Sequence, residues 1–249
     1  MNIKNSVGLF GKLPAHGDFI YRNLPSSFIN AWDTWLQGCV ACSQEQLGEG
    51  WLDIYLTSPI WRFAFSDGVI DEHVWAGIVL PSVDRVGRYF PFSIVTHLPA
   101  SANPMELIAQ TQWFDVIEEL ALKALDGQLP IDELLEEINL HPCDQTEIYT
   151  TGATSLNTIA PQVNKLGTVI KMDFSEQSPR STYSHLLNAQ LKESLSSYSV
   201  WSTHGSQCVE PCLFYSRGFP PMQGVAAMLD GQWDQWGWSQ PCQLNSMQQ

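Results

Sequence analysis

One stretch of the chain, Trp75–Leu98 (WAGIVLPSVDRVGRYFPFSIVTHL), constrains the fold more than any other. It consists of two apolar segments, Trp75–Leu80 and Phe90–Leu98, on either side of a charged turn. Because both segments are rich in Val, Ile, Phe and Tyr, which suit a pleated and half-buried surface, we predict two β-strands here. Pro81 and Pro91 cannot donate a ladder hydrogen bond, so strand pairing should stop near them.

The rest of the chain predicts an α+β fold, in which a mostly antiparallel central sheet is flanked by helices. A doubly wound parallel sheet is disfavoured, because the early strands follow one another without intervening helices. Residues 1–140 are expected to form an N-terminal part, and residues 141–249 a C-terminal part packed on it in the same compact unit. Further strands are predicted at Val7–Phe10, Trp51–Thr57, Trp61–Ser66, Leu166–Phe174, Ser199–Thr203 and Cys212–Ser216, and helices at Phe28–Leu47, Pro104–Gly127, Ile131–Leu140, Tyr183–Ser197 and Val225–Leu229.

The charge of the chain restricts the class of partner. Twelve basic and 26 acidic residues give a formal net charge of −14. Such a chain repels phosphate backbones and anionic membrane surfaces, so we expect neither nucleic-acid binding nor membrane insertion. No apolar run reaches the roughly 18–20 residues of a membrane span. The N-terminus also has no apolar signal-peptide core. These features predict a cytoplasmic protein, whose six cysteines are free thiols.

Five charges in predicted turns form the candidate site: Asp18, Arg22, Asp84, Arg85 and Arg88. They are conspicuous in a chain with only 12 Lys and Arg residues. In one interpretation, Asp84 pairs with Arg85 or Arg88, or Asp18 with Arg22, and the pairs fix the loop geometry. In the other, exposed arginines bind a partner protein.

Catalytic motifs are weak. His16, Asp18, Ser82 and Asp84 could supply a Ser-His-Asp group, but no G-x-S-x-G elbow occurs and any chain of this length offers such combinations. Gly8–Lys12 resembles a phosphate loop superficially, yet it lacks both the G-x-x-x-x-G-K spacing and the following Ser or Thr. We therefore do not expect an enzyme, and a small hydrolase or phosphatase-like activity using these loops is kept as the alternative.

A metal site and a cofactor site are not expected either. Cys39 and Cys42 have the spacing of a redox or zinc pair but fall inside a predicted helix. Zinc would need two further ligands, for which Cys208 and Cys212 or His204 are the only plausible source. Whether the four cysteines come together is left open by their spacing.

Two other features have a structural interpretation. Trp32 and Trp35 lie on the apolar stripe of the first predicted helix and are interpreted as core residues. Glu133, Glu136 and Glu137 lie opposite the apolar side of the helix at Ile131–Leu140. They are interpreted as its solvated face, with an acidic partner-binding face as the alternative.

Several longer motifs are similar to those of the TagF (ImpM) family, the accessory proteins of bacterial type VI secretion systems. They are GLFGKLPAHGDFIYRNLP, WDTWL, SPIWRF and above all WAGIVLPSVDRVGRYFPF, followed later by SVWSTHGS, GFP and VAAML. The resemblance is strongest over the first hundred residues and extends to nearly the whole chain. It departs from the family at GFP, where GLP is more usual, and in WSTHGS, which has Ser where a second Trp is common.

The resemblance implies a cytoplasmic regulator without catalytic residues or cofactor. Family members repress assembly or firing of the secretion apparatus after translation, through a forkhead-associated-domain scaffold protein. Some relatives are fused to a PP2C-type phosphatase domain, and nothing in this chain indicates one. A structural subunit of the secretion machine is the other alternative to a regulator.

Overall fold

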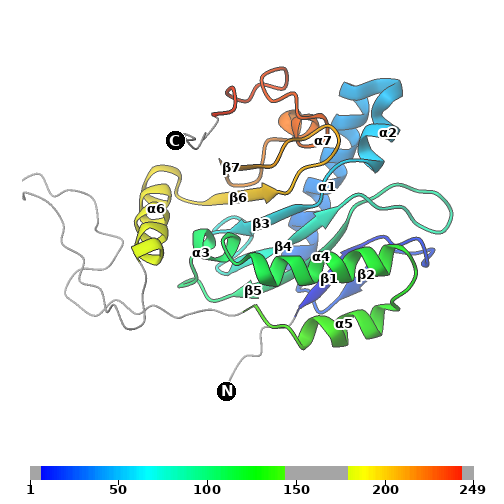
Figure 1. Ribbon diagram of the computed structural model, residues 1–249, viewed down its shortest axis with the longest axis horizontal. Helices are drawn as coiled ribbons and strands as arrows, with labels where there is room; N and C mark the ends of the chain where they lie inside the picture. The colour runs from blue at the N-terminus through cyan, green and yellow to red at the C-terminus, as the bar shows by residue number, and fades with distance from the viewer. Residues whose placement is uncertain (1–6, 144–178, 243–249) are drawn as a thin grey trace, which may run out of the picture.

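The computed structural model describes residues 7–143 and 179–242, and within these ranges seven strands form one sheet. Every pairing between them is antiparallel, in the order β2-β1-β5-β4-β3-β6-β7 (Figure 1). The predicted α+β fold with a mostly antiparallel sheet is thus confirmed. The strands are β1 (Gly8–Gly11), β2 (Ile20–Arg22), β3 (Trp61–Phe65), β4 (Val74–Leu80), β5 (Phe92–Leu98), β6 (Tyr198–Thr203) and β7 (Cys212–Arg217).

The hairpin of β4 and β5 lies in the middle of the sheet, as its apolar sequence predicts. Its register runs from Val74 opposite Leu98 to Leu80 opposite Phe92. The ladder ends directly before Pro81 and begins again directly after Pro91. Both strands are buried almost throughout, because the sheet is covered on both faces.

Helices cover the two faces of the sheet, with α4 in front and α1 behind it in Figure 1. The helix α5 packs against α4, and α6 packs against α3 and β6. The helical elements are α1 (Ser26–Leu47), η1 (Gly48–Gly50), α2 (Trp51–Leu56), α3 (Pro104–Ile108), α4 (Thr111–Leu125), α5 (Ile131–Asn139), α6 (Pro179–Leu195), η3 (Met222–Gly224) and α7 (Ala226–Asp230).

The core behind the sheet is aromatic and has Trp32 of α1 at its centre. This side chain is fully buried. Its ring lies 5.0 Å from those of Trp35 and Phe63 and 6.3 Å from that of Trp201. The indole N–H donates to Ser93 Oγ on β5 at 3.0 Å, so the one polar group of the side chain is satisfied. The interpretation of Trp32 and Trp35 as core residues is confirmed.

The core in front of the sheet is mostly aliphatic. Phe114 and Ile117 of α4 and Leu134 of α5 pack in one cluster with Ile78 and Ile94 of the central strands. Alternation along each strand separates the two cores, because successive side chains point to opposite faces.

Two predicted elements differ from the structure. Trp51–Thr57 is wrong as a strand, because Trp51–Leu56 forms the helix α2. Trp51 and Tyr55 are one helical turn apart, both buried, and their rings stack at 4.8 Å. The single helix expected over Pro104–Gly127 is two helices, interrupted at Gln110, whose ψ of 71° is not helical. The strand predicted at Leu166–Phe174 lies outside the described residues.

The sheet contains strands from both parts of the chain. β6 pairs with β3 on the side opposite β4, with Ala64 facing Val200, and β7 continues the sheet beyond β6. The strands Ser199–Thr203 and Cys212–Ser216 are thus confirmed within a residue. The division into parts at residue 140 stays a prediction.

Candidate partner-binding loop

The loop of residues 81–91 joins β4 to β5 and folds into a tight charged turn around Asp84. The carboxylate atom Oδ1 accepts hydrogen bonds from the backbone N–H groups of Val86 (3.0 Å) and Arg88 (2.9 Å). Gly87 donates its N–H to the carbonyl of Asp84 at 3.0 Å and has a φ of +86°, a conformation that glycine adopts without steric cost. A single bridge between Val83 and Tyr89 closes the base of the turn.

Two cations hold the same carboxylate. Lys12 Nζ lies 3.0 Å from Asp84 Oδ2, and Arg88 Nε lies 2.6 Å from it. Burial of the Asp84 side chain opposes ionisation. The backbone N–H of Arg88, the Lys12 ammonium, the Arg88 guanidinium and the N–H of Val86 outweigh that effect, so the pKa of Asp84 lies well below its usual range. Asp84 is therefore a fixed negative charge inside the loop.

The loop is also bound to the segment that follows β1. Ser82 Oγ donates to the carbonyl of Lys12 at 2.6 Å. The N–H of Arg85 donates to the carbonyl of His16 at 3.0 Å, and Arg88 Nη2 donates to the carbonyl of Gly17 at 2.6 Å. Because both segments contribute, the turn has a defined position on the rest of the protein.

Arg85 differs from its neighbours. Its side chain is exposed, and within the described residues no hydrogen bond or ion pair engages its guanidinium group. Val86 beside it is 67% exposed. The turn thus presents one unpaired cation and one apolar side chain to solvent. An unpaired guanidinium on a fixed backbone is suited to binding a carboxylate or another anion.

The five predicted site residues fall into two groups. Asp84 and Arg88 form the expected ion pair, and Arg85 lies in the same turn without joining it. No contact between Asp18 and Arg22 is found in the described part of the chain, where Arg22 Nη1 instead donates to the carbonyl of Tyr21 at 2.9 Å. Both Asp18 and Arg22 are exposed.

Sequence reasoning missed Lys12, which is buried and carries the second positive charge of the site. Its ammonium group also lies 4.9 Å from the ring centroid of Phe19, a cation–π contact. The only signal was a lysine two positions after the predicted strand Val7–Phe10. Two further clusters of charged side chains lie away from the loop.

The first cluster joins the sheet to α4. Arg62 of β3 is buried and donates to Glu118 through Nε (2.6 Å) and Nη2 (2.9 Å), and to Asp115 through Nη2 (2.6 Å). His204 Nε2 lies 3.8 Å from Asp115. Because the guanidinium already occupies both carboxylates, this cluster fastens the helix to the sheet.

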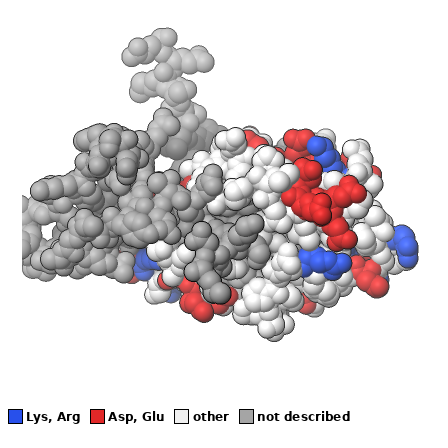
Figure 2. Space-filling model, turned by 90° about the horizontal axis from the view of Figure 1, so that it is seen from below, with Lys and Arg blue, Asp and Glu red and all other residues white. Residues whose placement is uncertain are grey.

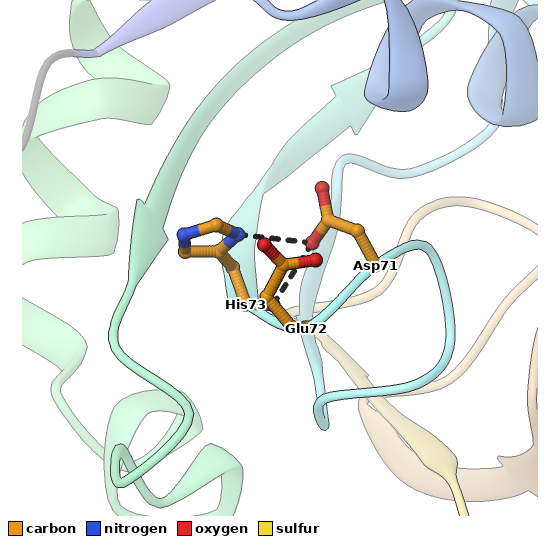
Figure 3. Close-up of side chains that lie close together, drawn as sticks. All are labelled: Asp71, Glu72 and His73. Atoms are coloured by element: carbon orange, nitrogen blue, oxygen red, sulfur yellow. Dashed lines mark hydrogen bonds and ion pairs between the residues drawn. The ribbon is translucent and has the colours of Figure 1, made fainter.

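The second cluster lies before β4 and comprises Asp71, Glu72 and His73 (Figure 3). Asp71 Oδ1 accepts from the N–H of His73 and from Trp75 Nε1, both at 2.9 Å, and Oδ2 accepts from Ser27 Oγ at 3.1 Å. Burial opposes ionisation of Asp71, and these hydrogen bonds overcome it and lower its pKa. The carboxylate ties the start of α1 to the start of β4.

The cysteines are not gathered into one group of possible metal ligands in the described part of the chain. All six are free thiols, as expected. Over residues 7–143 and 179–242, the groups of at least three close metal-ligand atoms are the two clusters just described, and neither contains a cysteine. Cys39, Cys42, Cys208 and Cys212 therefore do not come together.

The acidic side chains of α5 are exposed, whereas Leu134 and Ile138 on its other side are fully buried. Asp and Glu gather on the face seen from below in Figure 2, along which α5 lies in Figure 1. The acids are thus exposed on the side of the helix opposite its buried residues, which agrees with a solvated face and leaves the partner-binding alternative a prediction. No helix among the described residues is both long and apolar enough to cross a membrane.

Comparison with known proteins adds a family match. Residues 8–140 match a family model described as the TagF N-terminal domain, type VI secretion system-associated. The fold is similar to the crystal structure of PA0076 from Pseudomonas aeruginosa PAO1, determined at 2.05 Å resolution. The two proteins are 30% identical with a TM-score of 0.76, over 97% of this chain and 100% of the other. No curated protein matches the sequence.

Proposed function

Because this chain belongs to the TagF family of type VI secretion system-associated proteins, we propose that it regulates such a system by binding another of its proteins. In this proposal, the chain represses assembly or firing of the apparatus after translation. It acts in the cytoplasm by holding the forkhead-associated-domain scaffold protein, as its resemblance to the family implies. No catalytic step is involved.

One observation supports the choice of the 81–91 loop as the binding surface. Arg85 is exposed and has no partner among the residues that the structure describes, and the backbone of its turn is fixed. A turn held by Asp84, Lys12 and Arg88 loses little conformational freedom when a partner binds, so more of the interaction energy appears as affinity. Arginine is also enriched among the residues that dominate protein interfaces.

Two residues of the hydrolase alternative, Ser82 and Asp84, are engaged in holding the loop. Ser82 Oγ donates to a backbone carbonyl, and Asp84 is held by two cations and two N–H groups. A nucleophile and its base must contact each other and the substrate. The commitment of these groups to loop structure supports binding over hydrolysis.

Isothermal titration of the purified scaffold protein into the purified chain tests the proposal. Arg85→Ala should weaken binding about tenfold or more without a change in melting temperature, as expected for a residue that dominates an interface. Arg88→Ala should lower the melting temperature, because it removes part of the Asp84 clamp. Arg217→Ala, on the edge strand β7, is the control: it removes one exposed hydrogen bond, to the carbonyl of Ser194, and should leave binding unchanged. Equal binding by wild type and Arg85→Ala would exclude this loop as the binding surface.

Deletion of the gene tests the direction of the effect. A repressor is dispensable for secretion, so its loss should raise the amount of secreted substrate in the medium. If secretion is abolished instead, the chain is a structural subunit of the machine, and the repressor proposal is wrong.

A further inference from the structure

A small apolar cavity opens at the base of the 81–91 loop, between α1, α2 and α7. Its volume is about 60 Å³. That is less than half of the roughly 150 Å³ of a cavity that holds benzene, so an aliphatic side chain fits better than an aromatic ring. Its lining includes Trp35, Cys39, Val40, Tyr55, Pro81 and Leu229.

The polar groups in the wall of this cavity already have partners. Ser43 Oγ donates to the carbonyl of Val40 and accepts from Trp51 Nε1. Tyr55 Oη donates to the carbonyl of Ser82 and accepts its N–H, both at 3.0 Å. The Cys39 thiol is kept neutral by burial, which raises its pKa, with the neighbouring Cys42 adding to the effect. A hydrocarbon occupant therefore leaves no polar group of the wall unsatisfied.

The cavity lies within reach of Arg85. Pro81 lines the cavity, and Arg85 follows it by four positions along the chain. Four residues span at most about 14 Å of backbone, so one extended segment of about five residues covers the distance from the cavity to the backbone of Arg85.

The exposed charges at the two ends of this surface favour one orientation of a bound segment. The loop end carries the unpaired Arg85 and the partly exposed Arg88, whereas η1 and α2 beside the cavity carry the exposed carboxylates of Glu49 and Asp53. Acidic groups are favoured near the loop and disfavoured near the helix, and complementary charge of this kind fixes the register of a partner.

We infer that cavity and turn together bind one extended segment of the partner protein, with an aliphatic side chain in the cavity and an Asp or Glu within about five residues on Arg85. This inference rests on the proposed function for the identity of the partner, and names the chemistry by which the partner is recognised. The aliphatic side chain in the cavity and the carboxylate on Arg85 both contribute to affinity, so loss of either contact weakens binding.

Selection of a random twelve-residue peptide library, displayed on phage, against the full chain tests the inference. Enriched peptides should contain Val, Leu or Ile with Asp or Glu within five positions. Their binding should fall at least tenfold on Arg85→Ala and on Val40→Phe, which places a ring at the cavity. Leu122→Phe, an exposed position of α4, is the matched control and should bind the peptides like the wild type.

Folding of each variant is checked by its melting temperature, and Leu229→Phe is a second way to fill the cavity. If no peptide is enriched, if the enriched peptides lack the pattern, or if both filled variants bind them fully, the inference is wrong. Scaffold binding that is unaffected by Val40→Phe would also overturn it, while the proposed function would stand. Peptides with the expected pattern, together with a scaffold protein that does not bind, would instead overturn the proposed function alone.

Discussion

Lys12 Nζ lies 3.0 Å from Asp84 Oδ2 although 72 positions separate the two residues in the sequence, and both side chains are buried. The pair joins the end of β1 to the turn between β4 and β5. Because Arg88 holds the same oxygen, only Arg85 among the arginines of this turn is left for a partner.

The Asp84 clamp should make stability depend on acidic pH. The pKa of Asp84 is lowered in the folded state, so its contribution is complete above the unfolded pKa of about 3.9 and is lost as the pH falls toward the folded value. Urea unfolding should therefore show that Asp84→Asn is less stable than the wild type above about pH 5, with a gap that narrows below pH 4. The exposed Asp18→Asn is the control. A gap that stays constant from pH 6 to pH 3 would contradict the role of this carboxylate.

Trp32→Ala should destabilise the protein by about 3–5 kcal/mol, the range for loss of a buried large aromatic side chain. The substitution leaves a cavity in the aromatic core and removes the donor to Ser93. Leu122→Ala, at an exposed position of α4, should change the free energy of unfolding by less than about 0.5 kcal/mol. Similar losses for the two variants in urea titrations would show that Trp32 is not the centre of this core.

Arg62→Ala should cost about 3 kcal/mol, the lower end of the range for breaking a buried ion pair. The lower end applies because Asp115, with a side chain 60% exposed, regains water when the guanidinium is removed. Arg62→Met should cost less, since its apolar chain can fill part of the space beside Phe114, over whose ring the Arg62 guanidinium lies. Chemical denaturation measures the free energy of unfolding of both variants. An equal decrease for the two would mean that packing of the residue 62 side chain contributes little to stability.

The cysteines should react in the order of their exposure. Cys208 and Cys242 are exposed, whereas Cys39 is buried with a raised pKa, so little of its thiolate form is present at neutral pH. Mass spectrometry after timed labelling with a maleimide should find the first two modified within minutes and Cys39 only on unfolding. Early labelling of Cys39 in the folded protein would show that the cavity beside it opens much further.

Local pattern predicted much of this fold. The β-branched and aromatic segments beside Pro81 and Pro91 determine β4 and β5, and the apolar stripe of Phe28, Trp32 and Trp35 determines the buried side of α1. Where the helical signal was only six residues long, as in α2, aromatic enrichment indicated a strand instead. There, the spacing of Trp51 and Tyr55 was the better guide.

The candidate site was predicted only in part, because some of its contacts lie within one turn and others join segments that are distant in the sequence. Asp84 and Arg88 are four positions apart, and their pairing is a property of one turn. The contact of Lys12 with Asp84 depends on the pairing of β1 with β5, which no local pattern reports. Arg22, the expected partner of Asp18, lies on the edge strand β2 and donates to the carbonyl of Tyr21 instead. Both charges are exposed, and an exposed ion pair contributes little to stability.

The order of the strands also determines when β3 gains its second neighbour during synthesis. Phe63 of β3 lies between β4 and β6, and β6 is translated long after the family-matched region 8–140 is complete. At about 5–20 residues per second, the ribosome takes roughly 3–12 s to add the sixty residues from 140 to 200. During that interval one edge of β3 has no neighbour, and the aromatic side chains facing α1 lack Trp201. A nascent chain that has paired β3 with β4 therefore exposes the other edge of β3, a template for pairing with a second chain, until β6 emerges.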